Sequence, residues 1–297
     1  MKIKSILVTG GSGFLGSHVC DELIRRGYQV TNYDKKKSEW AHNTKKYKMI
    51  VGDINNFKLL DKQVKRNDII FHFAGLANLD EAIKKPLETV KYNIFSTVKL
   101  LALANKYKIE RFIYASSIYA NSSDGGFYSL SKRAAENYIQ EYFNHYRLGF
   151  TIMRYGSLYG PRSGKDNGIK RIIDNAIKNR QVSYGGNKKT VRKYIEVHEA
   201  AKLTADMIKK KYENKYISIV GKKKIKVQKL LEIVRDKLGI KKKIIYKKDK
   251  LFGHYTQSLK KYQSQIDKQY FSKKNYNFKS KVAKLIDYEL NKNKLCS

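Results

Sequence analysis

The sequence predicts an α/β protein in which a parallel β-sheet carries helices on both faces. In the first half of the chain, short apolar segments alternate with helical segments, as in sheets whose strands are joined by crossover helices. The apolar segments are continuous, which is typical of strands buried on both sides. A glycine-rich loop joins the first strand to the first helix. We therefore expect a doubly wound parallel sheet followed by a smaller α/β part.

The composition is that of a globular protein. The chain has 297 residues, of which 41% are hydrophobic, enough for one large or two small domains. No apolar run approaches the ~20 residues that span a bilayer, and the opening MKIKSILVTGG lacks the features of a signal peptide. Two cysteines, Cys20 and Cys296, form neither a disulfide framework nor a metal cluster. We expect a cytoplasmic protein without a metal and without a membrane partner.

The net charge of +37 has two interpretations. Such a charge attracts phosphates, nucleic acid or anionic lipid. The lysines, however, are spread along the whole chain in pairs and triples, together with many Asn, Ile and Tyr residues. This is the composition that an AT-biased genome produces. The sequence therefore favours a solvated basic surface over a nucleic-acid-binding one.

The first half of the chain contains six expected strands and four expected helices. The strands lie at 2–10, 28–34, 48–53, 68–75, 111–117 and 149–156. The helices lie at 11–29 after its glycine loop, 55–65, 86–108 and 127–147. Pro86 stands at the start of the third helix, where its missing N–H costs nothing. Residues 1–153 are expected to form the first domain.

After Tyr155 the alternation weakens. Helices are expected at 167–178, 198–212, 227–239 and 280–291, and strands at 192–197 and 215–221. There is no internal repeat and no Gly/Ser linker. Residues 154–297 should therefore form mainly a smaller part, with segments near 190–220 returning to the first domain.

The glycine loop predicts a dinucleotide site. Gly10, Gly13 and Gly16 lie between a strand and a helix, where glycine allows a tight turn, close approach of a pyrophosphate and close helix packing. The diphosphate would lie at the helix N-terminus. Asp34 ends the second strand, where an acid binds ribose hydroxyls and disfavours a 2′-phosphate. The sequence therefore predicts a Rossmann-type domain with NAD rather than NADP, although Lys35 to Lys37 weaken that preference.

Tyr128 and Lys132 are four residues apart on an expected helix and so share a face. A tyrosine has a pKa near 10, and a neighbouring ammonium group favours its phenolate. Ser117, at the end of the fifth strand, could hydrogen-bond the same substrate hydroxyl. With 23 tyrosines in the chain, this spacing also arises by chance. The dinucleotide loop upstream favours the catalytic interpretation of Ser117, Tyr128 and Lys132.

Several ordered motifs resemble the NAD-dependent nucleotide-sugar epimerase/dehydratase family of extended short-chain dehydrogenase/reductases. They run from the N-terminus to about residue 210 and read VTGGSGFLGSH, GDI, HFAGLA, KYNIFSTVKLL, RYGSLYGPR and RKYIEVHEAA. The connection between Ser117 and Tyr128 is shorter than the family's usual acidic loop. Where the family's RYFN segment carries Asn, this chain has Gly156 and Ser157.

The resemblance implies roles for further residues. Those implied to bind the cofactor, besides the three glycines, Asp34, Tyr128 and Lys132, are Phe14, Leu15, Asp53, Ile54, Phe73, Ala74, Gly75 and Asn93. Those implied to bind the substrate are Ser117, Ser157, Asn167 and Arg192. By the same resemblance Asp53 would contact the adenine and Arg192 the sugar-nucleotide diphosphate.

The resemblance also implies a reaction. Tyr128 would take the proton of a sugar C4 hydroxyl while the C4 hydride passes to NAD. The family's dehydratases and decarboxylases carry carboxylates directly after the catalytic Ser or Thr, whereas Ile118 and Tyr119 follow here. This favours 4-epimerisation of a nucleotide sugar, with UDP as the default nucleotide. The alternatives are a keto-sugar reductase and a Rossmann-fold protein that binds nucleic acid through its basic surface. The expected assembly is a homodimer formed through helices 86–106 and 127–147.

Overall fold

The chain folds as two compact units. The computed structural model describes residues 4–40, 42–247, 268–271 and 277–295. The first unit comprises Met1–Tyr155, Ala201–Ile219 and Lys260–Tyr270, and the second comprises Gly156–Ala200, Val220–Leu259 and Phe271–Ser297. Of the segments near 190–220, the part from Ala201 onward thus belongs to the first unit.

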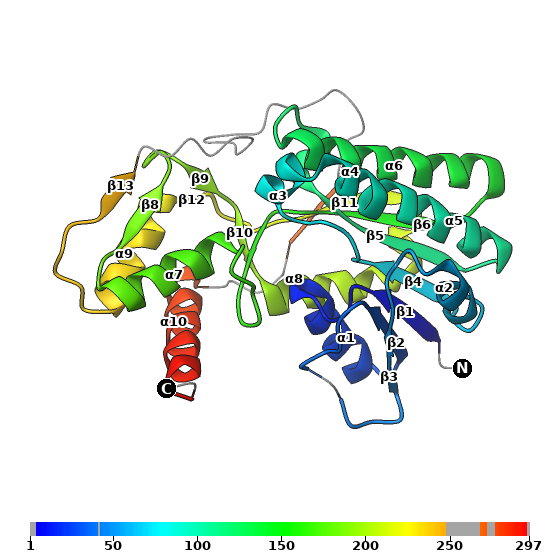
Figure 1. The fold of residues 1–297 in the computed structure, drawn as a ribbon, viewed down its shortest axis with the longest axis horizontal. Coiled ribbons are helices and arrows are strands. Elements are labelled where there is room, and N and C mark those ends of the chain that lie inside the picture. The colour runs from blue at the N-terminus through cyan, green and yellow to red at the C-terminus, as the bar shows by residue number, and fades with distance from the viewer. Residues whose placement is uncertain (1–3, 41, 248–267, 272–276, 296–297) are drawn as a thin grey trace. The chain divides into compact units, whose positions relative to one another are not determined.

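The first unit is built on a parallel sheet that has eight strands within the described ranges (Figure 1). Their order is β14-β11-β6-β5-β4-β1-β2-β3. The strands are β1 (Ser5–Thr9), β2 (Gln29–Asp34), β3 (Tyr47–Val51), β4 (Ile69–His72), β5 (Arg111–Ser117), β6 (Phe150–Tyr155), β11 (Lys215–Ile219) and β14 (Lys268–Tyr270). The strand order reverses at β1 and β4, which is where such sheets bind ligands beyond their carboxyl ends. The predicted doubly wound α/β fold is confirmed.

Helices pack on both faces of this sheet (Figure 1). On one face, α2 (Phe57–Val64), α5 (Ser96–Lys106) and α6 (Gly126–Tyr146) share a core with the central strands. Leu60, Leu100 and Ile139 from these helices are buried against Phe112 and Ile152 from the strands. α1 (Phe14–Arg25) covers the opposite face and packs against β1 and β2. Burial on both faces explains the continuous apolar strands.

The prediction of a single α-helix at 86–108 needs a correction, because the middle of this helical run is π-helical. The structure has α4 (Pro86–Thr89), a π-helical segment (Val90–Phe95) and then α5. Hydroxyl side chains explain the break, because the Ser96 Oγ donates to Tyr92 O (2.6 Å) and the Thr97 Oγ1 donates to Asn93 O (2.8 Å). These bonds occupy carbonyls that an α-helical ladder uses, and such side-chain bonds bend helices. A π-helical turn often marks a functional position.

The expected helix at 198–212 also ends early. α8 (Val197–Ala205) is followed by two 3₁₀ turns, Asp206–Ile208 and Lys210–Tyr212. Two short helices, α3 (Leu79–Lys84) and the 3₁₀ helix Ile118–Asn121, were not predicted from the sequence. Each is too short to show a helical apolar period.

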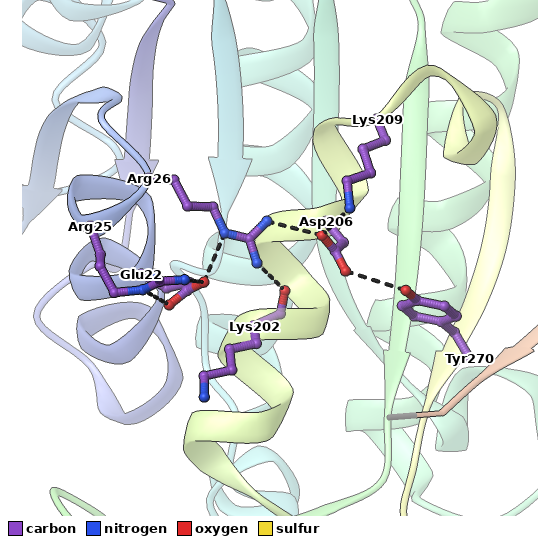
Figure 2. A network of polar contacts seen from close by, with 7 residues as sticks. All are labelled: Glu22, Arg25, Arg26, Lys202, Asp206, Lys209 and Tyr270. Atoms are coloured by element: carbon purple, nitrogen blue, oxygen red, sulfur yellow. Dashed lines mark hydrogen bonds and ion pairs between the residues drawn. The ribbon is translucent and has the colours of Figure 1, made fainter. Parts of the chain in front are cut away.

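A polar network joins α1, the turn after α8 and β14 within the first unit (Figure 2). The Asp206 carboxylate accepts hydrogen bonds from Arg26 (3.0 Å), Lys209 (2.6 Å) and the Tyr270 hydroxyl (3.2 Å). Arg26 also donates to the Lys202 carbonyl oxygen (2.9 Å). The network therefore ties three segments that are far apart in the sequence to one carboxylate.

The second unit has its own apolar core. α7 (Gly168–Asn179), α9 (Val227–Lys237) and α10 (Phe278–Leu295) contribute to it through residues such as Ile173, Leu231 and Ile286. Three two-stranded pairings accompany them: β7 (Ser157–Tyr159) with β10 (Tyr194–Glu196), β8 (Ser183–Gly185) with β13 (Ile245–Lys247), and β9 (Val191–Arg192) with β12 (Ile225–Lys226). The single strand expected at 192–197 is thus divided between β9 and β10. In the described part of the chain, no helix combines the length and the apolar character needed to cross a membrane.

Candidate active site

The conformation of the glycine loop requires the absence of side chains at Gly10 and Gly16. Gly10 has φ +77°, and a Cβ there would lie 2.6 Å from the Ala74 nitrogen. A Cβ on Gly16 would lie 2.2 Å from the Gly10 carbonyl oxygen. Gly13 precedes α1 in extended conformation, and no side chain caps the helix there. The first turn of α1, with Phe14 and Leu15, can therefore present backbone N–H groups to a diphosphate, which fits a dinucleotide.

Asp34 lies beside this loop. Its carboxylate accepts a hydrogen bond from the Ser12 backbone N–H (3.0 Å) and another from the Lys36 backbone N–H (3.1 Å). The contact with Ser12 fixes the acid at the edge of the glycine loop. A carboxylate so placed fits the hydroxyls of a ribose next to the diphosphate. The loop and this acid together meet the chemical requirements of NAD.

Asp53 and Ile54 follow β3. The Asp53 carboxylate accepts hydrogen bonds from the Asn55 backbone N–H (2.8 Å) and from the Tyr92 hydroxyl (3.4 Å). The Tyr33 hydroxyl donates to the Asp53 carbonyl oxygen (2.8 Å). Ile54 is buried. The hydroxyl groups of Tyr33 and Tyr92 therefore hold this turn in place. The role of Asp53 at the adenine stays a prediction.

The turn after β4 is joined to the π-helical segment by Asn93. The Phe73 and Ala74 backbone N–H groups both donate to the Thr9 carbonyl oxygen (2.9 and 3.0 Å). Asn93 is buried, accepts from the Leu76 N–H (2.7 Å), and donates to the Leu76 carbonyl oxygen and to the Ser131 Oγ (both 2.9 Å). A Cβ on Gly75 would lie 2.6 Å from the Asn93 Oδ1. Asn93 thus positions the loop and α6, and a direct contact with the cofactor stays a prediction.

Ser117 and Tyr128 lie at the end of β5 and the start of α6. Both are buried, with 6% and 8% of the residue surface exposed. Burial raises the pKa of Tyr128 to about 12, and a hydrogen bond with Ser117 acts in the opposite direction. Gly125, just before α6, has φ +93°, and a Cβ there would lie 2.9 Å from the Tyr119 ring. Glycine therefore permits the short connection that brings Tyr128 to Ser117.

Lys132 lies one turn after Tyr128 and is also buried. Its Nζ donates to the Ala115 carbonyl oxygen (2.9 Å) and lies 4.8 Å from the centre of the Tyr114 ring. Burial lowers the pKa of Lys132 to about 8, whereas the charge of Glu136 raises it. Tyr128, Ser117 and Lys132 are thus gathered at one end of β5 and α6. A phenol, a hydroxyl and an ammonium group so placed can move a proton to and from a substrate hydroxyl.

Two buried groups beside this cluster were not predicted from the sequence. Glu136 is paired with Arg154, and His72 is hydrogen-bonded between Thr9 and Thr97. The signal for Glu136 was its position one turn after Lys132. No neighbouring sequence feature indicated Arg154, because it lies on β6 whereas Glu136 lies on α6.

The predicted substrate residues Ser157, Asn167 and Arg192 belong to the second unit. Ser157 begins β7 and Arg192 ends β9. Asn167 caps α7, because its Oδ1 accepts from the Ile169 N–H (3.1 Å) and its Nδ2 donates to the Leu158 carbonyl oxygen (2.8 Å). A substrate contact of these three residues stays a prediction.

Comparison with known proteins identifies the family. Residues 6–220 match the NAD dependent epimerase/dehydratase family. The chain belongs to this family. The predicted resemblance is confirmed, and with it the expectation of an NAD-dependent enzyme of the epimerase/dehydratase class.

Two relatives show the range of this epimerase/dehydratase family. The chain is 29% identical over 263 residues to a putative UDP-glucose 4-epimerase of Methanocaldococcus jannaschii, covering 82% of this chain and 85% of the relative. It is also 29% identical over 231 residues to the human dTDP-D-glucose 4,6-dehydratase, covering 70% of this chain and 66% of that protein.

The fold agrees with that of a solved structure. A UDP-glucose 4-epimerase of Thermotoga maritima, determined with UDP-glucose, superimposes with a TM-score of 0.83 at 23% identity. The match covers 97% of this chain and 99% of that chain. At this identity the likeness shows the fold alone.

Proposed function

We propose that this protein is an NAD-dependent nucleotide-sugar 4-epimerase that acts on a UDP-sugar. The observation that carries the proposal is the buried cluster of Ser117, Tyr128 and Lys132 in the unit that holds the glycine loop. The first unit binds NAD, and the second unit, with Ser157, Asn167 and Arg192, binds the nucleotide sugar. Arg192 is assigned to the diphosphate because guanidinium groups pair well with phosphate oxygens.

The chain's own residues manage the proton of the sugar hydroxyl. The Tyr128 oxygen, as phenolate, takes the proton from the C4 hydroxyl and later returns it, while the Ser117 hydroxyl holds the same oxygen. Burial raises the pKa of Tyr128 to about 12, and the hydrogen bond with Ser117 acts against this rise. The Lys132 ammonium, one turn away on α6, would further favour the phenolate. When bound, NAD supplies the acceptor that takes the C4 hydride and gives it back to the other face of the sugar.

The segment between Ser117 and Tyr128 supports epimerisation over elimination. Elimination of water from a sugar needs an acid and a base next to the reacting carbons. Ile118 and Tyr119 directly follow Ser117, and Asp124 is the one carboxylate between Ser117 and Tyr128. The Ser122 hydroxyl donates to the Asp124 carboxylate (3.2 Å). The 4-keto sugar therefore has no paired carboxylates in this segment, and return of the hydride completes the reaction.

The test begins with purified protein. Denaturation should release NAD(H), detected by absorbance, because an epimerase regenerates its cofactor within each cycle. The native protein is then incubated with UDP-glucose, UDP-N-acetylglucosamine and their C4 epimers. We expect interconversion of at least one pair, and a loss of about 10²–10⁴-fold in kcat in Tyr128→Phe. Retained NAD in that variant shows that the cofactor site is intact.

Other outcomes would replace this proposal with an alternative. Consumption of added NAD(P)H with a keto-sugar, without interconversion, would identify a reductase. If no sugar reacts and the protein retains RNA in a salt-sensitive manner, a nucleic-acid-binding protein is the better interpretation. Epimerisation that is undiminished in Tyr128→Phe would contradict the assigned base.

We also propose a homodimer formed through the helical layer of α4, α5 and α6. α6 contacts both α4 and α5, and exposed apolar side chains lie on α4, on α6 and on the π-helical segment between α4 and α5. The most exposed are Leu87 (84%) on α4, Tyr146 (57%) and Leu130 (56%) on α6, and Val90 (50%) in the π-helical segment. Burial of this surface by a second copy would stabilise association. Light scattering at micromolar concentration should give twice the 34.6 kDa chain mass, and Leu87→Glu with Leu130→Glu should give the single mass. A single mass for the unmodified protein would reject the dimer.

A further inference from the structure

Glu136 and Arg154 form a buried ion pair in the first unit. The Arg154 Nε donates to the Glu136 Oε1 (3.0 Å) and an Arg154 terminal nitrogen donates to the Glu136 Oε2 (2.6 Å). The two side chains are 4% and 2% exposed. The Ser116 hydroxyl donates a third hydrogen bond to the Glu136 Oε1. A buried pair of this kind is costly to break and is weakly explained by stability alone.

The pair is attached to both elements that carry the catalytic cluster. Glu136 lies one turn after Lys132 on α6, so the two side chains share a helix face. Ser116 immediately precedes Ser117 on β5 and is in register with Arg154 on β6. The carboxylate therefore joins α6 to β5 at the level of the catalytic residues.

We propose that Glu136 is a positioning residue that keeps the buried amine of Lys132 protonated, with Arg154 limiting the strength of that negative charge. The inference rests on the proposed function, in which the Lys132 ammonium favours the Tyr128 phenolate. It assigns the ion pair to the control of the pH range of the reaction.

The other titratable groups around Lys132 do not keep its amine protonated, so this role falls to Glu136. His72, on β4, is held between the Thr9 and Thr97 hydroxyls, and burial together with the Lys132 charge lowers its pKa to about 3, so it is neutral. Burial raises the pKa of Tyr114, on β5, so Tyr114 is neutral near pH 7. Burial also raises the pKa of Tyr128, on α6, so Tyr128 becomes negative only as the phenolate that the Lys132 ammonium itself favours. Against burial, which lowers the pKa of Lys132, the charge of Glu136 is the influence that raises it.

Two substitutions of opposite charge test the proposal. Glu136→Gln removes the negative charge, so Lys132 should lose its proton at a lower pH, by about one unit. Arg154→Met leaves Glu136 uncompensated, so Lys132 should keep its proton to a higher pH, by a similar amount. The alkaline limb of the kcat profile should move in the same two directions. Mere structural damage would lower activity in both variants without opposite shifts.

A chemical readout follows Lys132 without any sugar. Acetic anhydride acylates the neutral amine, so the extent of Lys132 labelling as a function of pH, measured by peptide mass spectrometry, gives its protonation midpoint. The exposed Lys178 on α7 serves as the internal standard. This arm reports on Lys132 even if no sugar is epimerised, so failure of the proposed function remains distinguishable from failure of this inference.

A double variant covers the case in which a single substitution prevents folding. Glu136→Gln with Arg154→Met removes both buried charges, and buried ion pairs can often be replaced in this way without loss of stability. Since Glu136 acts on Lys132 from the same helix, the double variant should label with a midpoint below that of the unmodified protein. Opposite shifts in the single variants, or the lowered midpoint in the double variant, support the proposal. Shifts in the same direction, or unchanged midpoints, overturn it.

Discussion

Lys132 is placed where its charge costs stability. Burial lowers its pKa from the ordinary 10.5 to about 8, so the folded protein holds this proton less tightly than the unfolded chain does. The penalty is fully present below pH ~8 and is relieved as the pH rises toward the unfolded value of ~10.4. If this ammonium acts as the proposed function requires, the protein exchanges stability for activity at this position.

Replacing Lys132 with methionine should therefore stabilise the protein while it removes activity. We expect the melting temperature of Lys132→Met to rise by about 3 °C or more at pH 7, because the buried charge is gone. The difference in the free energy of unfolding between the two proteins should shrink between pH ~8 and ~10.4. Urea titrations across this range measure it. A variant that is less stable at pH 7 would contradict the assignment of a costly charge.

Gly16 is a second position where a single added atom, the Cβ of any other residue, should disturb cofactor binding and stability. A Cβ on Gly16 would lie 2.2 Å from the Gly10 carbonyl oxygen, and backbone cannot move away as a side chain can. Gly16→Ala should lose retained NAD and melt several degrees lower, by about 2 kcal/mol or more in the free energy of unfolding. Cofactor release on denaturation and a thermal melt measure both effects.

Gly168→Ala is the matched control for Gly16→Ala. Gly168 is also near the start of a helix, and a Cβ there would meet nothing within 4 Å. Because alanine favours helix over glycine by about 1 kcal/mol, this control should retain NAD and melt at the same or a higher temperature. Equal losses in both variants would show that the glycine loop is not specially constrained.

At the scale of elements, Asp206 holds α1, the turn after α8 and β14 together (Figure 2). Burial acts to raise the pKa of Asp206, but hydrogen bonds from Lys209 and Arg26 outweigh it and lower the pKa below the ordinary value. The stabilisation is therefore present above the unfolded pKa of ~3.9 and is lost as the pH falls below it.

Asp206→Asn should remove about 2 kcal/mol from the free energy of unfolding at pH 7, because the arginine and lysine lose a charged partner. The difference from the unmodified protein should diminish as the pH falls below ~4. Denaturant titrations at pH 7 and at acidic pH measure this. Asp287→Asn is the control: Asp287 pairs with Lys237 but is 51% exposed, and exposed pairs contribute little. Equal effects of the two substitutions would contradict a special role of the network.

Sequence patterns could predict the long elements because their apolar period is local. All six strands expected before residue 157 are present, and α6 begins within one residue of its expected start. The π-helical segment was missed because it depends on where hydroxyl side chains bond, which hydropathy does not reveal. The paired strands of the second unit have two or three residues each, too few for a period, and they form through distant partners.

The residues of the candidate site also fall into two groups: those that local sequence patterns indicate, and those that only the fold brings together. The glycines, Asp34, Ser117, Tyr128 and Lys132 could be selected because each stands at a strand end or at helical spacing. The predicted cofactor contact of Asn93 is untested, and the hydrogen bonds of its side-chain amide with Leu76 and Ser131 could not be predicted from the sequence, because they join distant segments. Arg154 was invisible because its partner, Glu136, lies on another element and a buried charge cannot be recognised in a chain so rich in exposed ones.

For the whole molecule, charge balance is the dominant feature. With 63 basic and 26 acidic residues, the folded chain repels itself, and salt screens that repulsion. The melting temperature should therefore rise by a few degrees when NaCl increases from about 0.05 to about 0.5 M, since the Debye length falls to a few ångströms. Thermal melts in NaCl and in KCl at equal ionic strength measure it. A lower melting temperature at high salt would contradict net repulsion.

The strand order has a consequence for how the protein is made on the ribosome. β6, whose residues are all buried in the finished sheet, is complete at Tyr155, but its outer neighbour β11 starts only at Lys215. At a synthesis rate of about 5–20 residues per second, the backbone edge of β6 remains unpaired for about 3–12 s until β11 has been made. During that interval an exposed strand edge can pair with other nascent chains. We therefore expect slower translation between Tyr155 and Lys215 to lower the yield of folded protein.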